Sequence, residues 1–249
     1  MELNADVGEL PGDAGRASDR EILTVVNTAN IACGAHAGDD AVMRATLEIC
    51  VELGVTAAAH PGYPDRAGFG RRRGTLTPAQ IQESVREQIL VLVSHAGALD
   101  LVLSRVKAHG ALYNEAMGER ETAEALLLGI EGALPKCAVV GLAGSPFLQW
   151  ARAHGFRVLA EGFADRGYRA DGTLVPRSEP GALVEDEEEA ARRAVRMAMH
   201  GAVTAVDGSE VALSIDTLCV HGDQPGAAAR AAAVRRALRA AGIALRSAP

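Results

Sequence analysis

The chain has 249 residues, of which 48% are hydrophobic and 23% charged, and it carries a formal net charge of −7 at pH 7. This length allows one sizeable hydrophobic core, so we expect a single domain over residues 1–249. The negative charge argues against a nucleic-acid-binding surface, which would need a basic stripe, and no apolar run approaches the ~20 residues that span a bilayer. The chain begins directly with a strand-like segment, which predicts a cytoplasmic protein without a signal peptide.

Short apolar runs alternate with helical stretches along the whole chain. The runs predicted as strands are 1–6, 28–33, 55–59, 102–107, 138–142, 156–160 and 214–220. Alternation of strand and helix is typical of α/β folds with parallel pairing. Seven such strands favour a closed or nearly closed β/α barrel, and a doubly wound open sheet is the second choice.

Residues typical of helix ends mark several of the intervening helices. The segment 18–21 has the form of a capping box, and Asp39 or Asp40 precedes a periodic run that ends at Gly54. The segment 77–80 combines an N-cap Thr, a Pro in the first turn and a Gln three residues after the Thr. Further helices are expected to begin near 145–146, 185–189 and 223–225.

Four histidines each follow a short apolar run and have a glycine within two residues. They are His36, His60, His109 and His221. The carboxyl ends of parallel strands meet at one face, where such folds keep their chemistry. We therefore expect the four imidazoles to share one mouth, because a purely structural role is improbable for all four together.

Carboxylates, amides and a lysine occupy the same predicted strand ends. Asn4 and Asp6 lie on one face of the first strand because side chains alternate, and Glu9 follows in the loop. The chain has only two lysines, and Lys107 lies two residues before His109, so we predict a functional role for it. The other candidates that follow strands are Asn30, Tyr63, Arg66, Tyr113, Asn114, Glu161 and Arg166.

A hydrolytic metal site is one chemistry that these side chains could support. Asp6 with two of His36, His60 and His109 could supply the three ligands of a Zn²⁺ ion that keeps one position open. No HxxH or HExxH spacing supports this interpretation. Whether a divalent metal is bound therefore stays open at this level.

Metal-free chemistry is the alternative. Asp6 and Glu161 could act with the histidines as acids and bases, with Lys107 stabilising an oxyanion. Phosphoryl chemistry is a third possibility, but the chain contains no Walker-type phosphate loop. Arginines near Gly70 could still hold a phosphate or a carboxylate.

Two long loops, 61–76 and 161–180, have a length that is often functional. Each contains an Asp-Arg pair, at 65–66 and 165–166, and these pairs could simply be ion pairs that fix the loops. The four cysteines lack metal-binding or redox spacing, so we expect small buried residues in a reduced protein.

Six segments taken together resemble the LamB/YcsF family. They are LNADVGE at 3–9, NIACGAHAGD at 30–39, HPGYPDR at 60–66, VKAHGALYN at 106–114, EGFADR at 161–166 and CVHGD at 219–223. The resemblance runs in order over essentially the whole chain. Two positions depart from the family pattern, since Ala35 stands where Phe is usual and Ala108 where Pro is usual.

This resemblance implies a seven-stranded β/α barrel similar to polysaccharide-deacetylase and glycoside-hydrolase barrels. It also implies the role of the A subunit in prokaryotic 5-oxoprolinase, which opens the lactam of 5-oxo-L-proline to L-glutamate. That reaction uses ATP with Mg²⁺ in the assembled enzyme and requires two partners, the B and C subunits. A membrane or a nucleic acid is not among the expected partners.

The resemblance and the residues together give a hypothesis for the site. Lys107 or an arginine would bind the substrate carboxylate, and Asp6 or Glu161, assisted by His60 or His109, would activate water. The residues expected to be catalytic are Asp6, His36, His60, Lys107, His109, Glu161 and His221. Those expected to bind substrate are Asn4, Asn30, Tyr63, Arg66, Tyr113, Asn114 and Arg166.

Two other classes of function stay open. A stand-alone metal-dependent deacetylase or amidase on the same barrel would contain stoichiometric Zn²⁺ and would lose activity on chelation. A non-catalytic protein that only scaffolds its partners would keep activity after His36, His60 and His109 were replaced together. Ionisable groups at five or six strand ends argue against pure scaffolding, because buried charges without a function are costly.

Overall fold

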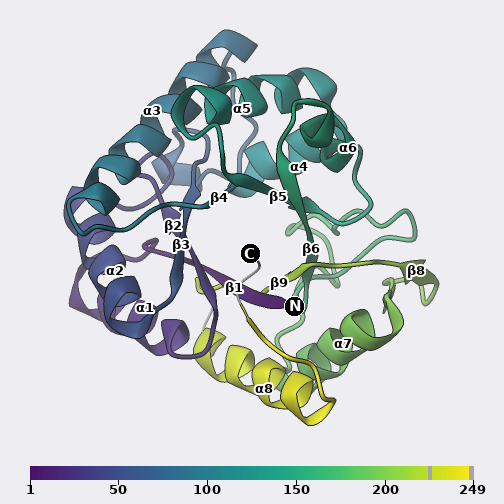
Figure 1. The fold of residues 1–249 in the computed structure, drawn as a ribbon. Helices are drawn as coiled ribbons and strands as arrows, with labels where there is room; N and C mark the ends of the chain where they lie inside the picture. The colour runs from purple at the N-terminus through teal and green to yellow at the C-terminus, as the bar shows by residue number, and fades with distance from the viewer. Residues whose placement is uncertain (224–225, 247–249) are drawn as a thin grey trace.

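The computed structural model describes residues 1–223 and 226–246 and shows a closed barrel of parallel strands (Figure 1). The strands follow the order β1-β2-β3-β4-β5-β6-β9, and β1 pairs with both β2 and β9. Their bounds are β1 Glu2–Val7, β2 Thr28–Ala32, β3 Thr56–His60, β4 Arg105–Lys107, β5 Ala138–Leu142, β6 Arg157–Phe163 and β9 Thr217–Cys219. The predicted seven-stranded β/α barrel is confirmed, and the doubly wound open sheet is wrong.

Helices surround the barrel (Figure 1). Their bounds are α1 Gly12–Leu23, α2 Asp40–Leu53, α3 Pro78–Gly97, α4 Gly110–Gly118, α5 Arg120–Ala133, α6 Pro146–Ala153, α7 Glu187–His200 and α8 Ala227–Ala240, with a short 3-10 turn η1 at Arg66–Gly68. The sequence did not predict the antiparallel hairpin of β7 (Ala202–Thr204) and β8 (Glu210–Ala212). Within the described ranges no helix has both the length and the apolar character to cross a membrane.

Polar side chains of β1 line part of the barrel interior, and they place the site. Leu3 and its odd-numbered neighbours in β1 belong to the apolar core, whereas the even-numbered side chains of β1 are polar although they are buried. Side chains alternate along a strand, so the polar set faces the inside of the barrel. At its amino-terminal end Glu2 pairs with the buried Arg105 at 3.0 Å (Oε2 to Nη2). Nearer the carboxyl ends, the same face of β1 presents Asn4 and Asp6.

Four of the predicted helix starts are confirmed, and two of these are α6, which begins at Pro146 after Ser145, and α7, which begins at Glu187 after Asp186. The Asp39 side chain accepts the Val42 amide at the start of α2, and Gly54 ends that helix with φ 65°, a conformation that favours glycine. At α3 the Thr77 hydroxyl and the Gln80 side chain form the reciprocal bonds of a capping box.

The predicted capping box at 18–21 is wrong, because α1 already begins at Gly12. Asp19 lies inside the helix, where its buried carboxylate accepts the Gly8 amide at 3.0 Å. Burial raises the pKa of Asp19 to about 6.

The last helix, α8, begins at Ala227, and its predicted start includes residues 224–225, which lie outside the described residues.

Removing the α3 cap is expected to cost a measurable part of the stability. Thr77→Ala leaves the Gln80 amide without its hydroxyl partner and should lower the free energy of unfolding by ~1 kcal/mol. Thr75→Ala is the matched control, because Thr75 is exposed and lies two residues earlier. Urea denaturation measures both variants, and equal stabilities would contradict the capping role.

Candidate active site

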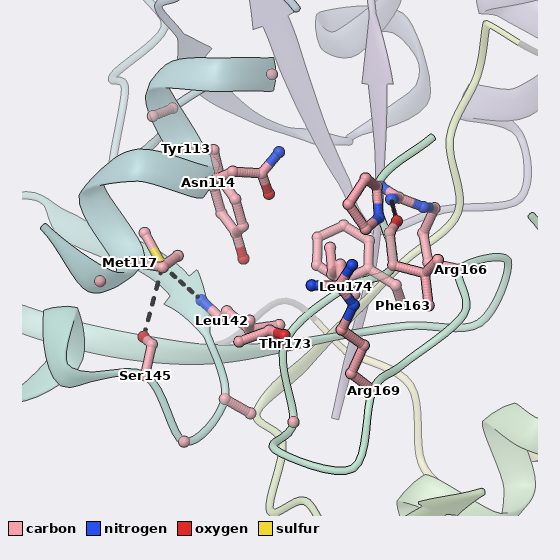
Figure 2. Close-up of a pocket in the computed structure, with 18 of the residues that line it drawn as sticks. Tyr113, Asn114, Met117, Leu142, Ser145, Phe163, Arg166, Arg169, Thr173 and Leu174 are labelled. Atoms are coloured by element: carbon pink, nitrogen blue, oxygen red, sulfur yellow. Dashed lines mark hydrogen bonds between the residues drawn. The ribbon is translucent and has the colours of Figure 1, made fainter. Parts of the chain in front are cut away.

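A cavity of about 920 Å³ opens at the carboxyl ends of the strands. Side chains at the ends of β1, β3 and β4 form part of its wall, namely Asp6, His60 and Lys107. Figure 2 shows Tyr113, Asn114 and Met117 of α4 on one side and the loop that follows β6 on the other. The predicted common mouth therefore exists as a cavity that admits a small molecule.

Lys107 lies at the base of this cavity between two carboxylates. Its Nζ is 2.9 Å from Asp6 Oδ1, 2.9 Å from Glu161 Oε1 and 3.1 Å from Cys219 Sγ. Burial opposes the charge of Lys107, but Asp6, Cys219 and Glu161 outweigh it and raise the pKa of the amine well above its usual value. The lysine therefore carries its charge at neutral pH.

The two carboxylates beside Lys107 differ in their environments. Burial alone would raise the pKa of Asp6, but Lys107 and His60 outweigh it and hold that pKa well below its usual value. Burial raises the pKa of Glu161, and Lys107 offsets this only in part. Asp6 lines the cavity, whereas Glu161 is completely buried. Of the two, Asp6 is therefore the carboxylate in contact with the cavity.

Amide and hydroxyl groups hold the carboxylates of Asp6 and Glu161 in place. Asn30 Nδ2 donates to Asp6 Oδ1 at 2.8 Å and to Asn4 Oδ1 at 2.7 Å. Asn4 Nδ2 donates to Glu161 Oε1 at 3.2 Å, and the Tyr113 hydroxyl donates to Glu161 Oε2 at 2.9 Å. Asn4 and Asn30 thus orient the carboxylates from inside the barrel, and Tyr113 does so from the cavity wall.

Three of the four predicted histidines gather around Glu9, and together these residues form what we call the Glu9 cluster. The Oε1 atom of Glu9 is 3.3 Å from His109 Nδ1, 3.5 Å from His36 Nε2 and 3.9 Å from His60 Nε2. All four side chains are buried. The sequence predicted Asp6 as the carboxylate of a metal set, whereas in the structure the carboxylate shared by all three imidazoles is that of Glu9.

Backbone carbonyls orient two of these rings. The carbonyl of Lys107 lies 2.8 Å from His60 Nδ1, and the carbonyl of Phe69 lies 2.8 Å from His109 Nε2. Burial lowers the pKa of His36 to about 4 and also lowers the pKa of His109. Burial opposes the charge of His60 as well, but Asp6 outweighs it and raises the pKa of His60.

The fourth histidine stands apart from this cluster. His221 Nδ1 lies 3.0 Å from Asp165 Oδ1, and the His221 amide donates to Asp165 Oδ2 at 2.8 Å. The ring stacks on Phe163 with a centroid separation of 5.5 Å. His221 therefore lines the cavity next to the ends of β6 and β9, outside the Glu9 cluster.

The Asp165 contact predicts a dependence of stability on pH. Burial would raise the pKa of Asp165, but His221 outweighs it and lowers this pKa to about 2, from an ordinary 3.8. A carboxyl group whose pKa is lower in the folded chain than in the unfolded chain stabilises the fold at pH values above its unfolded pKa. We therefore expect ~2 kcal/mol of stability to be lost as pH falls from about 4 to about 2. The slope of unfolding free energy against pH should be shallower in Asp165→Asn. Asp13→Asn, at an exposed carboxylate, should keep the wild-type slope; a wild-type slope in Asp165→Asn would contradict the assignment.

The whole chain matches one family. The model of the LamB/YcsF family covers residues 1–249. The chain belongs to the LamB/YcsF family. The resemblance predicted from six sequence segments is thereby confirmed.

Curated LamB/YcsF relatives span the full chain. The A subunit of 5-oxoprolinase from Pyrococcus furiosus is 45% identical over 98% of this chain and 95% of its own length. The A subunit of 5-oxoprolinase from Chloroflexus aggregans is 47% identical over 99% of this chain and 98% of its own length. The crystal structure of the lactam utilization protein from Thermus thermophilus superposes with a TM-score of 0.92 at 44% identity, covering 100% of this chain and 99% of that chain.

Four of the seven predicted substrate-binding residues of this LamB/YcsF barrel lie outside the cavity wall, namely Asn4 and Asn30 inside the barrel and Tyr63 and Arg66 in the loop after β3. The Tyr63 hydroxyl donates to Glu115 at 2.7 Å, and Arg66 donates to the carbonyls of Gly34 and Gly38 at 2.8 and 2.7 Å. Both side chains hold the loop between β3 and α3. By contrast, the predicted Asn114 and Arg166 both line the cavity.

Neither of the two predicted Asp-Arg ion pairs forms between sequence neighbours. Asp65 pairs with Arg72 rather than with Arg66, and Asp165 pairs with His221. Arg166 instead donates to the carbonyls of Ala182 and Val175 at 3.0 and 2.7 Å. Neither aspartate therefore pairs with the arginine that follows it in the sequence.

Several site residues have no predicted role in the sequence. Glu9 follows the first strand in a loop, and Gly8 with φ 71° makes the turn that brings it to the histidines. Cys219 lacks metal-binding or redox spacing, yet its sulfur contacts Lys107. The loop after β6 supplies two further cavity arginines, Arg169 and Arg177. The signal for these was the length of that loop together with its arginine content.

Proposed function

We propose that this chain is the A subunit of a 5-oxoprolinase, which opens the lactam ring of 5-oxo-L-proline to give L-glutamate. The observation that carries the proposal is the end-to-end match to the 5-oxoprolinase A subunits of Pyrococcus furiosus and Chloroflexus aggregans at 45% and 47% identity. Ring opening would use ATP with Mg²⁺ and would require the partner B and C subunits. The need for ATP supports a cytoplasmic location.

Asp6 and Lys107 are the proposed reacting pair. Asp6 has a pKa well below neutral, so its carboxylate is ionised and can orient water and accept its proton. Lys107, charged and 2.9 Å from Asp6, would stabilise the negative charge on the lactam oxygen and its phosphoryl group as water adds to the activated lactam and the ring opens. Glu161 is buried behind Lys107 and would hold the amine in place rather than contact substrate.

Arginines of the cavity would bind the anionic parts of the substrate. Arg71, Arg166, Arg169 and Arg177 all line the cavity. Guanidinium groups bind carboxylates and phosphates through paired hydrogen bonds. They suit both the carboxylate of 5-oxo-L-proline and the phosphoryl group of an ATP-activated lactam. The chain lacks a Walker-type loop, so we assign formation of that activated species to the B and C subunits.

Reconstitution tests the proposal. The B and C subunits, 5-oxo-L-proline, ATP and Mg²⁺ are combined with this chain added or omitted, and released L-glutamate is measured. We expect release only when the chain is present. Equal release without it would contradict the proposal.

A stand-alone metal-dependent amidase or deacetylase is the second candidate. The convergence of Glu9, His36, His60 and His109, with donor atoms within 4.8 Å of one another, favours it. This candidate predicts turnover by the isolated chain that is lost on chelation. Hydrolysis of amide substrates in the absence of the B and C subunits and ATP would support it over the first proposal.

A further inference from the structure

Three hydrogen-bond acceptors face one another in the Glu9 cluster. A backbone carbonyl can only accept, so the carbonyls of Lys107 and Phe69 place the ring protons on His60 Nδ1 and His109 Nε2. In the neutral rings this leaves bare lone pairs on His60 Nε2 and His109 Nδ1, which lie 3.1 Å apart. His109 Nδ1 lies 3.3 Å from Glu9 Oε1, and His60 Nε2 lies 3.9 Å from the same oxygen and 3.5 Å from Asp6 Oδ2.

No donor among the described residues satisfies this arrangement. Glu9 Oε1 is a buried oxygen without a hydrogen-bond partner there. Both ring nitrogens of His36 are likewise buried and unpartnered within the described part of the chain. Buried polar atoms of native proteins are nearly always paired, so such a group of orphans indicates a missing proton or cation.

The distances between the acceptors fit a metal ion. Metal–ligand bonds of about 2.0–2.2 Å in a tetrahedron separate the ligand atoms by about 3.3–3.6 Å. The three donor atoms here are separated by similar distances. His60 Nε2 and His109 Nδ1 are 3.1 Å apart, and Glu9 Oε1 lies 3.3 Å from His109 Nδ1 and 3.9 Å from His60 Nε2. The ring planes of His60 and His109 are 90° apart, so both lone pairs can converge on one point.

The surrounding charge also favours a cation. Glu9 is a buried carboxylate, and the ion pairs of Lys107 in the described chain are with Asp6 and Glu161 rather than with Glu9. Asp165 has its own partner in His221. Buried charge is costly unless it is paired, and a dication beside Glu9 would compensate the charge of this carboxylate.

We propose that Glu9, His60 and His109 bind one divalent transition-metal ion of the Zn²⁺ type at the base of the cavity. Two imidazoles and one carboxylate suit Zn²⁺, whereas Mg²⁺ prefers oxygen ligands, so this ion is distinct from the Mg²⁺ that accompanies ATP. The carbonyl bonds to both imidazoles are the outer contacts that fix the rings of metal ligands.

His36 is assigned to the wall of this site. Its ring stacks on His109 with planes 2° apart and centroids 3.8 Å apart, so the two lone pairs cannot point at the same ion in this conformation. The fourth position is therefore left for water or substrate, as in hydrolytic zinc sites. His60 and His109 both line the cavity, which gives the ion a path to that substrate space.

Metal titration tests the site without any reference to catalysis. The purified full-length chain is stripped with a chelator and titrated with Zn²⁺ by calorimetry and with Co²⁺ by visible absorption. We expect about one equivalent to bind and Co²⁺ to give the intense absorption of a tetrahedral site. Glu9→Gln and His109→Asn should each weaken binding at least ~100-fold, and Zn²⁺ should raise the melting temperature of the wild type more than that of either variant.

Glu161→Gln is the matched control, because Glu161 is also a buried carboxyl group of the barrel interior but contacts none of the three ligands. It should bind Zn²⁺ as the wild type does. Absence of stoichiometric binding by the wild-type chain would overturn the proposal and assign the missing charge to a proton shared by His60 and His109. Wild-type affinity in a folded Glu9→Gln or His109→Asn would overturn it as well.

Discussion

Replacing Lys107 by methionine is expected to lower the free energy of unfolding by ~3–5 kcal/mol and to abolish glutamate release by the assembled enzyme. Removal of the amine leaves Asp6 and Glu161 buried without their cation, and breaking a buried ion pair from one side has a cost of that size. The same change removes the group proposed to stabilise negative charge as the activated lactam opens. Urea denaturation and the reconstituted assay measure the two effects separately.

The chain offers its own control for this substitution. Lys136 is the other lysine and is exposed, so Lys136→Met should stay within ~0.5 kcal/mol of the wild type and keep full activity. Adding Glu161→Gln to Lys107→Met should recover part of the lost stability, because one of the two stranded carboxyl groups is then neutral. A loss below ~1 kcal/mol in Lys107→Met would show that the buried pair is not the contact described.

Asp6→Asn is expected to reduce kcat in the assembled enzyme by ~10²–10⁴-fold, the usual contribution of a positioned general base. The asparagine keeps the shape of the side chain and the hydrogen bond from Lys107, so the loss should fall on kcat more than on KM. Asp216→Asn is the control, because Asp216 precedes β9 at the opposite end of the barrel. It should leave kcat unchanged.

Glu161→Gln tests which of the two candidate carboxylates, Asp6 or Glu161, is the general base. If Asp6 is the base, Glu161→Gln should have a much smaller effect on kcat than Asp6→Asn, because Glu161 lies behind Lys107 and away from the cavity. The opposite order of effects would assign the base to Glu161.

The barrel could be predicted from the chain because its strands are short runs that alternate with recognisable helix signals. The capping box at 77–80 and the glycine at the end of α2 were readable, since each depends only on neighbouring residues. The start of α1 was misplaced because Asp19 satisfies the Gly8 amide through a contact between elements. The β7–β8 hairpin was missed because it forms a separate antiparallel sheet, outside the alternation of strand and helix that predicts the barrel.

The site was predictable in its members but not in its pairings. Histidines at strand ends were identified from position alone, and the barrel does bring His36, His60 and His109 together. Their common partner, Glu9, depends on a turn geometry that a list of residues does not specify. The interior contacts of Lys107 depend on the register of the closed barrel, which no local pattern encodes.

The most direct test of the account is a titration of this chain into fixed amounts of the B and C subunits with 5-oxo-L-proline, ATP and Mg²⁺. We expect the rate of L-glutamate release to rise in proportion to added chain and to reach a plateau when the partners are saturated. We also expect Asp6→Asn, added in excess, to lower the wild-type rate by occupying the same partners. A rate that is independent of the added chain would contradict the assignment of the hydrolytic site to this barrel.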